Sequence, residues 1–248
     1  MKKQAFWLPL VGVAALVLVW TAAFAILQNE YLLPSPLSVL QELGKVFSTA
    51  AFYGALFSTL LRAVIAFLIS LVLAAFFALV STLSPVFSKI FGGIVVILRS
   101  LPTMAVLLLI LVGTTRSAAP VAVGVLTLFP LLYTAIIGAI GGVDRELVEM
   151  CKVYKVPMKK RLLGLYLPSV LPRVALESVA AFSFSLKLVV SAEVLASTYQ
   201  SLGGWMQEAS LWAQTAKLMA ITAAVCAIGL LIELVGGFLI KKWEDALQ

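Results

Sequence analysis

The sequence contains no histidine, which removes the commonest proton relay and metal ligand from consideration. Its two cysteines, Cys151 and Cys226, fall in a basic segment and in an apolar run, so neither a disulfide nor a metal site is expected. Charged residues make up only 12% of the chain, against about 25% in soluble domains. A soluble globular fold is therefore not expected.

Apolar residues make up 62% of the 248 residues, and they gather in several runs of about 20 residues. This pattern predicts an all-α, polytopic membrane protein with a single transmembrane domain over residues 1–248. The net charge of +7 does not indicate nucleic-acid binding, because the basic residues cluster beside the apolar runs, where membrane topology explains them. Six spans are predicted, at about 6–27, 55–83, 102–113, 118–142, 174–197 and 216–240.

The first apolar run has two interpretations. Ala23-Phe24-Ala25 resembles a signal-peptide cleavage site, but the run is longer than a usual signal sequence and further spans follow it, which favours a retained helix. After this run, Ser35 is expected to cap an interfacial helix with Pro36 at its first position. Farther on, Arg99 to Pro102 interrupts an apolar run, which predicts a short interfacial helix, a break and then the third span.

The longest strongly charged segment is the loop 143–173 between spans four and five, which carries seven of the 18 basic residues. With the N-terminus inside, this loop joins Lys2, Lys3, Lys241 and Lys242 on the cytoplasmic face, as the positive-inside rule requires. Both termini are therefore expected in the cytoplasm.

The start of this loop predicts a short amphipathic helix. Its apolar residues have helical spacing (i, i+3, i+4, i+7), and the helix is too polar to span a bilayer. It could dock into another protein or rest on anionic lipid. The apolar residues are Leu147, Met150, Cys151 and Tyr154.

The same segment resembles the EAA motif of ABC importer permeases. Glu149-Met150-Cys151 is followed after three residues by Lys155, and after nine more by Leu165-Tyr166-Leu167-Pro168. The spacing and the place between spans four and five match the family, although Met150 and Cys151 replace alanines and Lys155 replaces a glycine. Segments at 32–40, 58–70, 98–111 and 192–206 are also similar to permeases of the nitrate/sulfonate/taurine branch.

The resemblance implies a type I ABC importer permease in the bacterial cytoplasmic (inner) membrane. Its partners would be a cytoplasmic ATPase dimer, a second permease subunit (identical or different) and an extracytoplasmic substrate-binding protein. The chain itself lacks a phosphate-binding loop, since its only Gly-Lys pair, Gly44-Lys45, is followed by valine. It is therefore expected to be a non-catalytic subunit without a cofactor, and ATP is expected on the ATPase. The expected coupling residues are Leu147, Glu149, Met150, Cys151, Tyr154, Lys155, Leu167 and Pro168.

Lys155 departs from the family at a position where glycine permits a left-handed turn. Such a turn costs a residue with a Cβ roughly 1–2 kcal/mol. Pro157 could set the turn in another way, because a proline disfavours helix at the residue before it, here Val156.

The fifth span contains ionisable residues at membrane depth, which are functional candidates by default. Lys187 lies on one helix face with Ser183 and Ser191, and Glu193 matches a glutamate of the family. These four residues are candidates for the translocation pathway, where Lys187 would attract an anionic substrate; a structural pair of Lys187 with a neighbouring helix is the alternative. Arg62 lies near a predicted span end, where snorkelling is the ordinary explanation. Gly203-Gly204 is expected in a re-entrant or external turn.

The sequence thus favours an importer permease whose substrate is a small anion, a sulfonate or a solute resembling a vitamin precursor. A secondary transporter working without an ATPase is the alternative, although no repeated halves with broken helices are apparent. An enzyme is disfavoured, because the sequence offers no histidine and no clustered pair of carboxylates.

Overall fold

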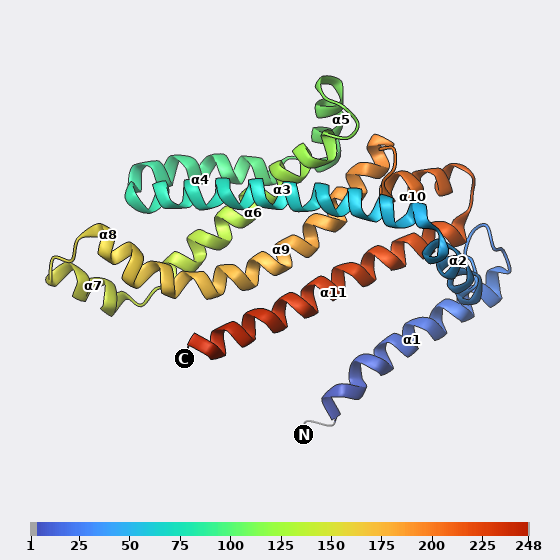
Figure 1. Ribbon diagram of the computed structural model, residues 1–248, viewed down its shortest axis with the longest axis horizontal. Helices are drawn as coiled ribbons and strands as arrows, with labels where there is room; N and C mark the ends of the chain where they lie inside the picture. The colour runs from blue at the N-terminus through green and yellow to red at the C-terminus, as the bar shows by residue number, and fades with distance from the viewer. Residues whose placement is uncertain (1–3, 248) are drawn as a thin grey trace.

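The computed structural model describes the backbone of residues 4–247 and the side chains of residues 11–243. Within that part the chain forms helices and connecting turns without a strand, so the expectation of an all-α protein is confirmed. Lys2 and Lys3, which were expected on the cytoplasmic face, lie outside the described residues. Figure 1 shows long helices running side by side, with short helices at both ends of the bundle.

Four helices are long and apolar enough to cross a membrane: α3 (Ala50–Leu83), α6 (Ala119–Gly141), α9 (Leu167–Ala196) and α11 (Thr215–Leu247). A fifth span results if α4 (Pro85–Ser100) and α5 (Thr103–Gly113), which meet at a bend of 91°, are counted together. With 11 residues, α5 is about 16 Å long and cannot cross about 30 Å of hydrocarbon alone. In α1 (Gln4–Leu27), the apolar described stretch Val11–Leu27 is shorter than a span, so six spans are not confirmed.

Small side chains on α3 allow it to pack closely against α6 and α9. They recur every three or four residues and are buried, so that they form one face of the helix. Close backbone approach through small residues is the usual way in which membrane helices associate. On the facing helix a Cβ at Gly124 would lie 2.8 Å from that of Ala66, which shows how tight the contact is. The small residues are Ala55, Thr59, Ala63, Ala66, Ser70, Ala74, Ala78 and Ser81.

The end of the bundle at the right of Figure 1 carries α2 (Pro36–Ser48) and α10 (Leu202–Leu211). Ser35 caps α2 by accepting a hydrogen bond from the Ser38 N–H, with Pro36 at the start of the helix, as expected. A turn was expected at Gly203-Gly204, and this expectation is wrong. Ser201 caps α10 by accepting a hydrogen bond from the Gly204 N–H at 2.9 Å. Both glycines therefore belong to the first turn of a helix.

The opposite end of the bundle carries α7 (Arg145–Val153) and α8 (Met158–Arg161), and α11 ends on the same side (Figure 1). A π-helical turn, Leu162–Tyr166, joins α8 to α9 without a break, so this helix starts well before the predicted span at 174–197. On the other side of the molecule, α1 makes its main contact with α2 and stands apart from the other long helices.

Candidate functional site

The short helix α7 is well capped at its start. Asp144 accepts a hydrogen bond from the Glu146 N–H at 2.9 Å, which satisfies one of the free N–H groups of the first turn. Glu146 in the first turn and Lys152 in the last turn both have the favourable sign for the helix dipole. Residues with these preferences at these places explain why so polar a segment is helical.

Lys155 ends α7 in the left-handed conformation, with φ at 49°. The Val156 N–H donates to the Cys151 carbonyl at 2.9 Å, and the Lys155 N–H donates to the Lys152 carbonyl at 3.0 Å. These two bonds define a Schellman motif, in which the left-handed residue is usually glycine. Lys155 therefore keeps the backbone that the family glycine favours, and the suggestion that Pro157 sets the turn in another way is wrong.

The two faces of α7 differ in exposure. Val148 packs against a cluster formed by Ala139, Val143 and Val170, while Cys151 on the same side of the helix is only 9% exposed. Cys151 therefore cannot fill a groove on another protein, in contrast to the expectation. Three of the four apolar residues that were expected to face a partner do remain exposed: Leu147, Met150 and Tyr154. Glu149 is exposed beside them.

The second half of the motif forms the entry to α9. Leu165 and Tyr166 lie in the π-helical turn and pack onto the same cluster that receives Val148. Leu167 and Pro168 form the first turn of α9, and both are exposed. The two halves of the motif are therefore tied to one small core, which links the position of α7 to that of α9.

The polar stripe on α9 faces α11. Ser183 is buried and donates to the Gly229 carbonyl at 3.1 Å, while Ser191 donates to the carbonyl of Lys187 in its own helix at 2.9 Å. Lys187 Nζ lies 3.8 Å from Glu233 Oε1, and both side chains are nearly half exposed. The pair with a neighbouring helix, which the sequence left open as an alternative, is therefore present, although its exposure also leaves Lys187 accessible.

Glu193 lies elsewhere, in a buried polar cluster that joins α3, α9 and α10. Its side chain is fully buried and accepts hydrogen bonds from Arg62 Nη1 at 2.8 Å, Thr59 Oγ1 at 2.9 Å and the Gly203 N–H at 3.2 Å. Thr59 in turn accepts from the Leu202 N–H at 3.0 Å. Burial of a carboxylate is costly unless it is paired and hydrogen-bonded, and here both conditions are met.

This cluster changes the interpretation of two residues. Arg62 does not snorkel but turns inward, with its side chain 15% exposed. Thr59 was not singled out from the sequence, and Gly203 was expected only in a turn and not as a donor to Glu193. The spacing of small residues along α3 places Thr59 on the buried face and offers the one signal that could have identified it.

Among the described residues, no group of His, Cys, Asp and Glu could hold a metal ion.

Comparison with known proteins adds to this geometry. A family model for binding-protein-dependent transport system inner membrane components matches residues 70–245. Among solved structures, the chain is similar to one described as an amino acid ABC transporter with histidines. The TM-score is 0.66 at 18% sequence identity, and the match covers 82% of this chain and 97% of the other, so the two share the fold. No curated protein matches the chain.

Proposed function

The chain belongs to the family of binding-protein-dependent transport system inner membrane components, and from this premise we propose that it is the permease subunit of an ATP-driven ABC importer. It would form half of the translocation pathway and bind a cytoplasmic ATPase dimer through α7. ATP is bound by that partner, because this chain has no phosphate-binding loop. An extracytoplasmic binding protein delivers the substrate.

The observation that carries this proposal is the exposed face of α7. Leu147, Met150 and Tyr154 project from the end of the bundle, where no other part of the described chain covers them. An amphipathic helix seated in a hydrophobic groove uses residues with this spacing as anchors. Movement of the ATPase would then pass through the core shared by Val148 and Tyr166 into α9, since packed helices move as rigid units.

Charge distribution supports the orientation of the protein. The basic residues of α8 and the C-terminal end of α11 lie at the same end of the bundle as α7 (Figure 1). The positive-inside rule places this end in the cytoplasm of a bacterial cell, with α2 and α10 on the outer side of the cytoplasmic membrane.

A second permease subunit is part of the proposal. Lys187 and Glu233 are nearly half exposed on helices of spanning length, and charged side chains at such places avoid lipid. The face that carries them would therefore line a pathway shared with the second subunit, which could be identical or different. Ser183, Ser191 and Glu193 lie on the same helix, but only Lys187 and Ser191 are exposed enough to meet a solute.

Lys187 also favours the substrate class. An accessible cation in the pathway suits a small anion, a sulfonate or an anionic solute resembling a vitamin precursor. Glu233, at 3.8 Å, would act as the counter-charge when no substrate is present.

Co-purification tests the proposed complex. The full chain, expressed with an ATPase encoded near its gene, should yield a stable complex that Met150→Asp disrupts. Leu211→Asp, at an exposed apolar position on α10 at the opposite end, is the control and should leave the complex intact. Substrate uptake driven by an ion gradient without any ATPase would instead identify a secondary transporter.

A further inference from the structure

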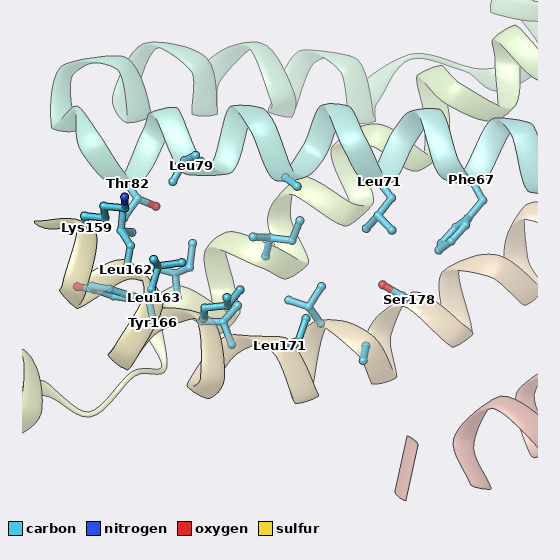
Figure 2. Close-up of a pocket in the computed structure, with 17 residues that line it drawn as sticks. Phe67, Leu71, Leu79, Thr82, Lys159, Leu162, Leu163, Tyr166, Leu171 and Ser178 are labelled. Atoms are coloured by element: carbon cyan, nitrogen blue, oxygen red, sulfur yellow. The ribbon is translucent and has the colours of Figure 1, made fainter. Parts of the chain in front are cut away.

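A large apolar groove of about 940 Å³ opens between α3, α6 and the segment that runs from α8 into α9. Figure 2 shows Phe67 and Ser178 near one end of the groove and Thr82 with Lys159 at the other. Its walls are almost entirely aliphatic and aromatic, and none of the described residues that line it is acidic. Because the helices that line it are long and apolar enough to cross a membrane, the groove would lie against the hydrocarbon layer.

The shape of the groove follows from residues on its two sides. Ala75 on α3 and Ala175 on α9 are small, so they leave space where larger side chains would meet. At the end near α8, the π-helical turn directs Leu162, Leu163 and Tyr166 to the wall, as Figure 2 shows for these three side chains. The groove is therefore elongated along the helices, as the labelled residues of Figure 2 show.

The charged residues lie at one end only. Lys159 lines the groove beside Thr82, and Lys160 and Arg161 follow it in the same short helix. The buried Nε of Arg161 has no hydrogen-bond partner within the described residues. The groove thus combines a long apolar body with a cationic end at Lys159, next to two further basic residues of α8.

We propose that this groove binds one anionic phospholipid, with an acyl chain along α3 and α9 and the phosphate at Lys159. A basic pocket between membrane helices, at the level of the headgroups, is the arrangement that recognises acidic lipids. Each buried methylene group of the chain adds to the affinity through the hydrophobic effect. A zwitterionic lipid would fill the same space without the charge attraction.

The site goes beyond the proposed transport function, because it would exist in the isolated chain. It lies directly behind the segment that leads from α7 to α9, so a bound lipid would pack against Tyr166 and Leu167. We infer that the lipid supports this connection, and that removing it loosens the attachment of α7.

Native mass spectrometry of the purified full chain, with added phosphatidylglycerol or phosphatidylcholine, tests the proposal. One phosphatidylglycerol should be retained in preference to phosphatidylcholine, and Lys159→Gln should lower that preference about fivefold, the effect of about one basic residue at a membrane surface. Lys89→Gln, an exposed lysine on α4 outside the groove, is the matched control and should keep the preference.

A second pair of variants tests the apolar body. Ala175→Phe should fill the groove and abolish retention of both lipids, while Ala51→Phe at an exposed position outside it should not. Helical content from circular dichroism confirms that each variant folds. Equal retention of both lipids by the unaltered chain, or unchanged retention in Ala175→Phe, would overturn the proposal. A further outcome would also overturn it. If the unaltered chain forms a dimer, and Ala175→Phe loses that dimer while lipid binding is unaffected, the groove holds a second copy of the chain.

Discussion

Arg62 Nη1 on α3 lies 2.8 Å from Glu193 Oε1 on α9, and the two form an ion pair across 131 positions of sequence. Glu193 is fully buried, and its second oxygen accepts from Thr59 and from the Gly203 N–H. One carboxylate therefore ties together three helices that no local sequence pattern connects. Removal of any partner would leave the others buried without compensation, which makes this cluster the sharpest test of the structure.

The first prediction concerns Arg62→Met, which keeps much of the side-chain volume but removes the positive charge. Glu193 then remains buried without its counter-ion, and the free energy of unfolding should fall by about 3–5 kcal/mol. Thermal unfolding of the purified full chain in detergent measures the loss. Glu193→Gln should cost less, since the amide oxygen can still accept from Thr59 and Gly203.

The reversed pair, Arg62→Glu with Glu193→Arg, tests whether the cluster depends on more than the attraction between two opposite charges. We expect no rescue of stability, because Thr59 and Gly203 donate to position 193 and an arginine there cannot accept. A reversed pair as stable as the original chain would show that the hydrogen bonds from α10 and Thr59 are unimportant.

A second prediction concerns the close approach of α10 to α9 at Gly203. A Cβ there would lie 2.6 Å from the Val190 carbonyl oxygen and 2.7 Å from the Val194 nitrogen, both of them backbone atoms that cannot turn aside. Gly203→Ala should therefore lower stability by about 1–3 kcal/mol, as overpacking does. Gly237→Ala, where nothing lies within 4 Å, is the control and should be neutral or slightly stabilising. Thermal unfolding of both variants in detergent compares them.

The broad architecture could be predicted from sequence because apolar runs and charge clusters are local properties. They indicated the helices α3, α6, α9 and α11, and the cap at Ser35 was predicted from a local preference. The ion pair could not be predicted, since nothing near Arg62 identifies a partner 131 residues away. Snorkelling was the reasonable local explanation, and it was wrong because tertiary packing supplied a stronger partner.

Three other features could not be predicted from the sequence, each for a different reason. The α7 stripe was drawn from spacing alone, but the side of a short helix that meets its own protein depends on neighbours, here Val143 and Val170, and Cys151 fell on that side. The turn at Lys155 was left open because a lysine with positive φ is uncommon, and the hydrogen bonds of the Schellman motif decide it. At Gly203-Gly204 glycines suggested a turn, whereas close packing of α10 required them.

A third prediction follows from that turn. Lys155→Gly should be tolerated and should stabilise the local structure by up to about 1 kcal/mol, because relief of the left-handed strain slightly exceeds the added entropy of the unfolded chain. Hydrogen exchange of the Val156 amide, which donates to Cys151, should slow or stay unchanged. Lys155→Val should accelerate exchange, since a β-branched residue fits this conformation poorly. Faster exchange in Lys155→Gly would contradict the interpretation.

A fourth prediction separates the two interpretations of Lys187. If Lys187 lines the pathway, Lys187→Met should weaken the uptake of an anionic substrate in reconstituted vesicles, with a larger apparent KM. Glu233→Gln removes the counter-charge and should not weaken uptake in the same way. If the pair is only structural, the double variant should transport like the original chain. Unchanged uptake, substrate profile and affinity in Lys187→Met would exclude substrate contact.

The last prediction concerns Glu149, which is exposed beside the apolar residues of α7. If α7 docks as proposed, its position in the motif would set it against a cationic group on the ATPase. Glu149→Lys places like charges opposite each other at the proposed contact, which costs several kcal/mol and should lower co-purification of the ATPase at least tenfold. ATP-driven uptake should fall with it, while the thermal stability of the chain should not change, because the side chain makes no hydrogen bond within the described residues.

The control for this experiment is Glu208→Lys, the same charge reversal at an exposed position of α10 on the opposite end of the bundle. It should leave the complex with the ATPase intact. A complementary change from a basic to an acidic residue on the ATPase should restore the Glu149→Lys complex, since the interaction would depend on opposite charge and not on the identity of either residue. Full ATP-driven uptake by Glu149→Lys alone would refute the docking role of α7, whatever the lipid groove behind it proves to bind.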